Sequence, residues 1–188
     1  MSSSHPYAPR TVVAVAYSWI TLIAFGGILA ETIILYPNIF HDAPASLEEA
    51  DRFFSQAGPG DYFRPLGAAT VVLAVATVVL LRHHRAARLW AAASLCTLVA
   101  GEFAFSALYF WPRNTIMFDE GPAVHSVEVL RQTAAEFETG HWVRMAVSGV
   151  TAVLAFVALF RLMQNPQFRD ERPAPSSNLT DVASPPRR

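Results

Sequence analysis

The sequence has little charge, and it contains no lysine. Of its 188 residues only 15% are charged, and all 14 basic residues are arginines. A soluble domain usually has about a quarter of its residues charged. The net charge of −1 also gives no reason to expect a nucleic-acid partner, since such proteins have basic surfaces. The composition therefore disfavours a soluble domain and a nucleic-acid-binding protein.

Cysteine and common catalytic motifs are also scarce. The single Cys96 has no partner for a disulfide and lies in an apolar segment, so we expect it to be a small buried hydrophobic residue. The sequence contains no Walker loop, no dinucleotide fingerprint and no Gly-x-Ser-x-Gly elbow. Hydrolases and nucleotide-driven pumps are disfavoured by these absences.

What the sequence does contain is long apolar runs, and 53% of its residues are hydrophobic. A membrane-spanning helix needs roughly 20 apolar residues. Four runs meet this length or approach it, at about 11–36, 65–81, 89–111 and 142–160. We therefore predict an all-α integral membrane protein, an antiparallel four-helix bundle, whose partner is the lipid bilayer. The bundle would occupy 11–164, between a short N-terminal segment (1–10) and a disordered proline-rich tail (165–188).

The charges in the connecting segments predict an orientation. The segment 82–88 contains three arginines and no acid, whereas 37–64 and 112–141 contain five acids and two arginines each. Cytoplasmic loops of membrane proteins carry the excess of basic residues. We therefore expect a multi-pass protein of the cell membrane, with both termini in the cytoplasm and two acidic loops outside.

Each outer loop is predicted to contain a short helix. Ser46 and Glu49 form a capping box, which predicts a helix from Ser46 to about Gln56. In the second loop, apolar residues recur at helical spacing from Val127 to Phe137. This amphipathic helix would lie on the membrane surface or cap the bundle, and it would lead through Gly140 into the fourth span.

Ionisable residues inside the spans are the first candidates for function, because a charge is costly in a bilayer. Glu31 and Glu102 both fall in the outer half of their predicted spans, and Arg144 lies near the start of the fourth. A polar collar around Arg144 would comprise Tyr109, Arg113, Asn114 and His141. One interpretation is a shared cavity. The other is a Glu31–Arg144 ion pair that fixes how the first and fourth helices pack.

A metal site is a more specific hypothesis for these residues, but the sequence lacks a full set of ligands. Glu138 and His141 form a Glu-x-x-His motif, and di-iron bundles combine two such motifs with two further glutamates. Glu31 and Glu102 would supply the two glutamates, but a second Glu-x-x-His is absent. We therefore predict no metal and no cofactor.

Two short motifs resemble those of a known family. The motifs are Tyr109–Asn114 and, some 27 residues later, Gly140–Met145. They resemble the anthrone-oxygenase-like family of small four-helix membrane proteins, many of them bacterial proteins of unknown function. The similarity would cover 11–163. It implies that the motif positions on this chain are Arg113, Asn114, His141, Trp142 and Arg144, without assigning a role to each. It also implies an activity of a minority of members, the oxidation of polycyclic anthrones by O2 without a conventional cofactor.

Three functional hypotheses follow. The first is an enzyme or binder of a small lipophilic, aromatic polyketide-like molecule. Its catalytic candidates are Glu102, His141 and Arg144, and its substrate-binding candidates are Glu31, Tyr109, Arg113, Asn114 and Trp142. The alternative is a non-catalytic accessory subunit that docks a larger membrane complex or its own copy. The third is a channel or proton path through Glu102, for which only Ser94 and Thr97 offer polar groups below it.

Overall fold

A computed structural model describes residues 9–164, and these are almost entirely helical, with no strand among them. Four of the helices are long and apolar enough to cross a membrane, so the predicted all-α, multi-pass membrane bundle is confirmed. The predicted disordered tail (165–188) lies outside the described residues, as do residues 1–8 of the predicted N-terminal segment.

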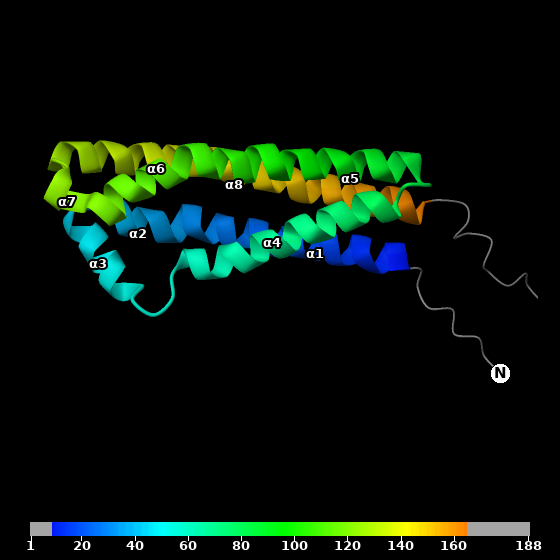
Figure 1. The fold of residues 1–188 in the computed structure, drawn as a ribbon, viewed down its shortest axis with the longest axis horizontal. Helices are drawn as coiled ribbons and strands as arrows, with labels where there is room; N and C mark the ends of the chain where they lie inside the picture. Colours follow the sequence, from blue (N-terminus) through cyan, green and yellow to red (C-terminus); the bar gives the residue numbers. More distant parts are fainter. Residues whose placement is uncertain (1–8, 165–188) are drawn as a thin grey trace, which may run out of the picture.

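The four spans follow each other antiparallel along one long axis (Figure 1). The first comprises α1 (Pro9–Ala30), wide turns at Glu31–Leu35 and α2 (Tyr36–Phe40). The second is α4 (Pro59–Leu80) and the fourth is α8 (Val127–Met163). The third begins with α5 (Arg85–Thr97) and continues to Val124 through wide turns and short helices. These are the turns Leu98–Ala104, Ser106–Phe110 and Thr115–Glu120, with α6 (Trp111–Asn114) and α7 (Gly121–Val124).

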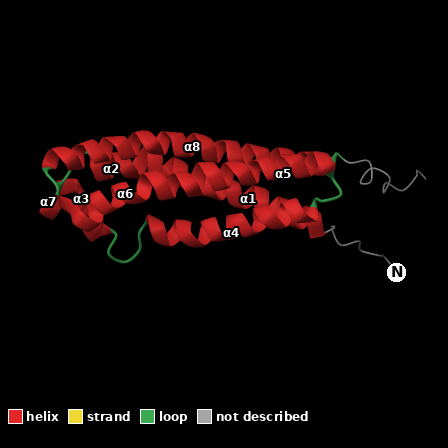
Figure 2. Cartoon of the chain, turned by 45° about the horizontal axis from the view of Figure 1, so that its top comes forward, coloured by secondary structure: helices red, strands yellow, loops and turns green. Residues whose placement is uncertain are grey.

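The helices pack unequally. α8 packs along both α1 and α5, whereas α4 packs mainly against α1 and α5. Figure 2 shows α4 along one side of the bundle, with its C-terminal end near α5 and its N-terminal half apart from α6. The divergence of α4 from the third helix determines where the functional site described below lies.

Pro37, Pro65 and Pro112 stand at ends of the predicted spans 11–36, 65–81 and 89–111, because proline favours a helix start or stop, but all three lie within helices. The first and third helices do not end at Pro37 and Pro112, and Pro65 lies inside α4 rather than at its start. Wide turns precede two of these prolines: the Tyr36 amide donates to the Glu31 carbonyl, and the Trp111 amide to that of Ser106. Such i→i+5 bonds let a helix continue past a residue that has no amide hydrogen.

The outer loops form a cap of short helices. The predicted capping box at Ser46 is wrong, because α3 (Ala45–Phe53) begins one residue earlier and the Ser46 hydroxyl accepts a hydrogen bond from the Asp42 amide. The amphipathic segment after Val127 forms the first turns of α8, which starts where Ser126 accepts a hydrogen bond from the Val129 amide. It runs through Gly140 without a break, as predicted.

Packed clusters of side chains divide the bundle into levels. The outer aromatic cluster joins α2, α8 and the third helix through Tyr36, Ile39, Phe40, Ala43, Leu47, Phe110, Met117, Ala134 and Phe137. The middle cluster contains Tyr17, Ala74, Leu98 and Ala155. The inner cluster contains Ala14, Leu81, Ala87, Ala91, Ala158, Leu159 and Leu162. Cys96 belongs to none of them. It is exposed on the surface of α5, so its predicted burial is wrong.

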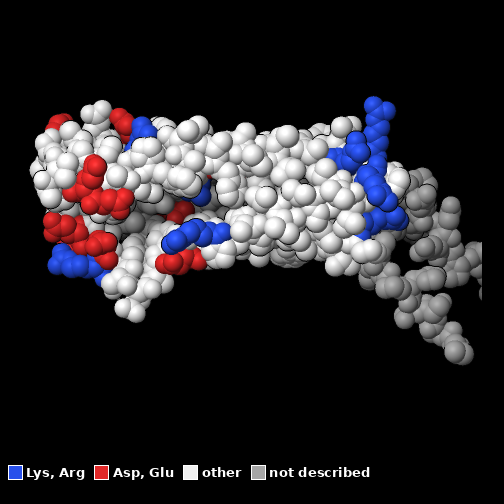
Figure 3. All heavy atoms as spheres, in the orientation of Figure 1, with Lys and Arg blue, Asp and Glu red and all other residues white. Residues whose placement is uncertain are grey.

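Charge separates along the long axis. Figure 3 shows arginines without acids at one end and the acids, with a few arginines among them, around the cap at the other; the body between them is almost uncharged. The arginine end contains Arg82 between α4 and α5, Arg85 and Arg88 in the first turn of α5, and Arg161 near the end of α8. A body of this kind matches the hydrocarbon of a bilayer.

The close contact between the third helix and α8 at Gly101 gives the first prediction. A Cβ added at Gly101 would collide with Val147, whose branched side chain cannot easily rotate away. We expect Gly101→Ala to destabilise the protein by about 1–3 kcal/mol, as overpacking does. Gly26→Ala is the control, since a Cβ there meets nothing within 4 Å. Thermal unfolding in detergent measures both, and equal melting temperatures would contradict this packing.

Candidate functional site

Arg144 lies on α8, with its guanidinium inside the bundle and poorly satisfied. Its Nη1 lies 3.5 Å from Nε2 of His141, at the limit of a hydrogen bond, and its Nε is buried with no hydrogen-bond partner. The rings of Phe63 and Phe110 lie beneath its Cζ, with centroids at 5.6 and 5.5 Å. An arginine has five donors, so this one retains donors for another group.

His141 is fully buried, and its neighbours define its tautomer. Its Nδ1 lies 2.9 Å from the Thr32 hydroxyl oxygen, and that hydroxyl donates its own hydrogen to the Ile28 carbonyl at 2.7 Å. The Thr32 oxygen therefore accepts from His141, which places the ring hydrogen on Nδ1. The lone pair on Nε2 then faces Arg144 and Glu31.

Glu31 completes this buried group from the first helix. The Tyr36 hydroxyl donates to its Oε1 at 3.1 Å, while its Oε2 lies 3.7 Å from His141 Nε2 and has no hydrogen-bond partner. Glu31 and Arg144 do not form the direct ion pair that one interpretation of the sequence predicts. Within the described residues, the imidazole of His141 contacts both side chains instead.

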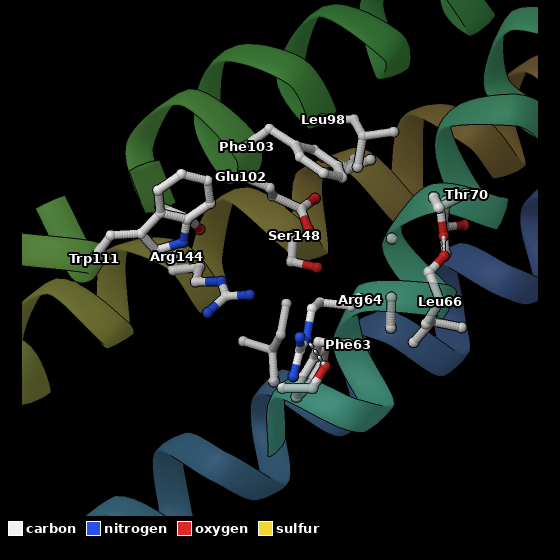
Figure 4. Close-up of a pocket in the computed structure, with 18 residues that line it drawn as sticks. Phe63, Arg64, Leu66, Thr70, Leu98, Glu102, Phe103, Trp111, Arg144 and Ser148 are labelled. Carbon is white, nitrogen blue, oxygen red and sulfur yellow. Dashed lines mark hydrogen bonds between the residues drawn. The ribbon is translucent and has the colours of Figure 1, made fainter. Parts of the chain in front are cut away.

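Glu102 approaches Arg144 from the third helix, out of the wide turns at Leu98–Ala104. It is 9% exposed. Figure 4 shows Glu102, Ser148 and Arg144 directed toward the same space, with Phe63 and Arg64 of α4 across from them. Glu31 and Glu102 thus reach the same guanidinium from different helices.

This space is a cavity of about 330 Å³ between α4, α1, α8 and the third helix. A second cavity of about 160 Å³ adjoins it and shares Gly60, Phe63, Ser106, Trp111 and Arg144 with it. Glu102 lines the larger cavity, whereas Glu31 and Asn114 line the smaller one. Arg144 therefore stands where the two meet. Together they lie within the size range of a small-molecule site, which is typically about 300–1,000 Å³.

Three of the predicted site residues lie elsewhere. The Tyr109 hydroxyl donates to the Glu136 carbonyl, and Arg113 stacks on the Tyr109 ring and pairs with the Glu136 carboxylate at 2.7 Å. These contacts tie the third helix to α8 above the cavity. Trp142 is 54% exposed and faces outward from α8. None of the three lines either cavity.

Several residues of the site are absent from the sequence-based prediction. Ser148 lies four residues after Arg144, on the same face of α8, so helical spacing alone indicates it. Thr32, Phe63 and Ser106 carry no such signal, because their roles depend on how helices far apart in the sequence pack together.

Below Glu102 a small group of hydroxyls links three helices. Tyr17 and Ser94 hydrogen-bond at 2.8 Å, Ser94 donates to the Thr151 carbonyl, and Thr151 donates to Thr97. This polar group is larger than the sequence predicts. It ends at Tyr17, however, which belongs to the apolar middle cluster, and Ser94 uses its hydrogen on a backbone oxygen. The arrangement disfavours a proton path through Glu102.

In the described part of the chain, no three of the side chains that bind metals gather at one place. The comparisons with known proteins add no assignment: no family model, curated protein or solved structure matches the chain. The site therefore has to be interpreted from its own chemistry.

The Thr32–His141 bond gives a second prediction. Thr32→Val leaves the His141 Nδ1–H without an acceptor in a fully buried place, which costs about 1–3 kcal/mol. Thr139→Val is the matched control, because Thr139 is exposed and its hydroxyl donates only to Ala135 of its own helix. Thermal unfolding compares the variants, and ¹⁵N NMR of the wild type should show the Nδ1–H form. An Nε2–H ring would contradict the assignment.

Proposed function

We propose that this protein binds a small lipophilic, aromatic molecule in the joined cavities and is an oxygenase of the anthrone-oxidising type. One observation carries the proposal: the guanidinium of Arg144 points into an apolar-walled cavity, and its one hydrogen bond within the described residues is the 3.5 Å contact with His141. Burying a donor without a partner is costly. A ligand that presents an acceptor oxygen to Arg144 would remove this cost.

The remaining cavity residues describe the shape and polarity of such a ligand. Phe63, Phe103 and Trp111 offer flat apolar surfaces. Glu102 offers acceptor oxygens, and Ser148 beside it offers a hydroxyl. A planar ring system with one oxygen acceptor near Arg144 and one acidic hydrogen near Glu102 fits both features.

The oxidation balances without a resident cofactor. In an anthrone the ring CH2 is acidic, because the carbonyl opposite stabilises the carbanion as an enolate. Glu102 would accept the proton and Arg144 would stabilise the enolate oxygen. Reaction with one O2 then converts CH2 into C=O and releases one H2O. His141 faces neither cavity, so we assign it the positioning of Arg144 rather than proton transfer to the ligand.

Family and orientation belong to the same proposal. The motifs Tyr109–Asn114 and Gly140–Met145 support membership of the bacterial branch of the anthrone-oxygenase-like family. The arginines at one end and the acids at the other support both termini in the cytoplasm of a cell whose membrane the protein spans. The cavity would then lie in the outer half of the bilayer.

A non-catalytic accessory subunit is the second candidate, and exposed apolar residues on the cap favour it. Phe53 is 80% exposed and Val124 is 66% exposed, and both lie in short helices of the cap, α3 and α7. Such side chains suit a protein partner above the membrane. In that case mild-detergent purification from the native membrane would yield a stoichiometric partner.

The test of the oxygenase is turnover of anthrone in proteoliposomes, followed as anthraquinone formation and O2 uptake. We expect wild-type protein to exceed protein-free liposomes, and Glu102→Gln to lower the rate by about 10²–10⁴-fold, the usual contribution of a general base. Glu49→Gln, an exposed acid of α3, should leave the rate unchanged. Equal melting temperatures would show that both variants fold. Full activity in Glu102→Gln, or no activity in the wild type, would contradict the proposed reaction.

A further inference from the structure

The larger cavity opens sideways, between α4 and the third helix. Phe103 and Trp111 line it and are also 44% and 65% exposed on the outside of the bundle. On the α4 side the lining residues include Phe63, Arg64 and Gly67. Figure 3 shows this face hollowed beside the charged side chains near the cap, with charged atoms visible in the hollow. The same residues thus form both the cavity wall and the outer surface.

Along the bundle axis the cavity is closed in both directions. Toward the acidic cap, Tyr36, Phe110 and Phe137 of the outer aromatic cluster line the smaller cavity as its roof. Toward the arginine end, Leu98 forms part of the wall and belongs to the middle cluster with Tyr17 and Ala74. A molecule that reaches Arg144 therefore has to pass between α4 and the third helix.

The depth of this opening in the bilayer indicates which part of the membrane it faces. α4 has 22 residues, about 33 Å at 1.5 Å per residue, which matches the roughly 30 Å of hydrocarbon. Its first turn carries the exposed Asp61–Arg64 pair, as expected at the interface with water. The cavity is lined by α4 residues from Gly60 to Thr70, the half of the helix next to that pair. The opening therefore faces acyl chains as well as the interface.

We infer that this opening is a lateral portal to one leaflet, and that the ligand is a membrane-dissolved amphiphile that enters from the lipid, polar group toward Arg144. The inference rests on the proposed binding site, but it does not depend on which aromatic molecule binds or on its oxidation. Arg64 at the lip would hold a polar group at the interface, and the rings of Phe103 and Trp111 would flank an apolar body.

Gly67 is the narrow point of the portal. A Cβ at this position would lie 3.1 Å from the Phe103 ring, so even alanine is tight there and a larger side chain would fill the gap. Gly26 is the matched control on α1, because it is exposed and has open space around it. Gly67→Phe should therefore close the portal, whereas Gly26→Phe should not.

The test measures access and not turnover. A nitroxide is placed in the cavity at Ser106→Cys, in a Cys96→Ser background, and the protein is reconstituted in phosphatidylcholine bilayers. Collision rates are measured by EPR with O2, which dissolves in lipid, and with a neutral nickel chelate, which stays in water. Leu108→Cys, at a position 80% exposed on the third helix, gives the lipid-facing reference.

We expect frequent collisions with O2 and few with the chelate at position 106. Adding Gly67→Phe should lower the O2 collision rate several-fold, and adding Gly26→Phe should leave it unchanged. Dominant collisions with the chelate, or an O2 rate that Gly67→Phe does not change, would overturn the portal. If the Ser106→Cys protein fails to fold, Ala24→Cys reports on the same cavity from α1. A portal that passes this test while anthrone is not oxidised would reject only the proposed reaction.

Discussion

A guanidinium buried inside a membrane protein needs hydrogen-bond acceptors around it. The structure of this protein depends on which groups serve Arg144 in this way. An arginine at the centre of a spanning helix costs about 2.5–3.5 kcal/mol on insertion scales. Here the compensation is partial: Nε2 of His141 lies 3.5 Å from Nη1, two carboxylates lie nearby, and Nε is left without a partner. Because the guanidinium also points into a cavity, it directs attention to a ligand.

The local helix geometry brings the carboxylates to Arg144. Glu31 begins one stretch of wide turns and Glu102 lies within another. A wide turn adds a residue to the helical repeat and so shifts the side chains that follow it, and such turns are frequent at functional sites. The Glu31 turns also carry the first helix past Pro37, and a further stretch of wide turns, Ser106–Phe110, carries the third helix past Pro112 and up into the cap. Wide helical turns therefore both position the side chains of the site and extend the bundle into the cap.

The sequence predicts the overall architecture well and the site only in part. Apolar runs define four spans because backbone groups in lipid must be paired within a helix. The two glutamates and Arg144 are identifiable because charge is rare in such runs. Span ends were wrong at Pro37 and Pro112, since a wide turn depends on packing that no local pattern shows. Tyr109 and Arg113 lie outside the cavity for a similar reason: their partner, Glu136, sits a turn above His141 on a helix that continues unbroken.

The cavity itself could not be predicted, because it results from the angle of α4 relative to the other three helices. Phe63, Gly67 and Ser106 have no chemical feature that marks them in the sequence. They become informative only when α4 diverges from the third helix and leaves space beside Arg144. A site of this kind results from helix packing. The chemistry of its ligand is inferred from the hydrogen-bond donors and acceptors that the packing leaves unpaired.

The most direct measurement is the ¹⁵N NMR signal of the Arg144 Nε in bilayer nanodiscs, with and without anthraquinone, assigned by its loss in Arg144→Lys. If Arg144 offers its guanidinium to the oxygen of a lipophilic ligand, that resonance should shift as anthraquinone is added and should saturate. An Nε resonance that stays in place while anthraquinone is shown to bind the protein would contradict this account.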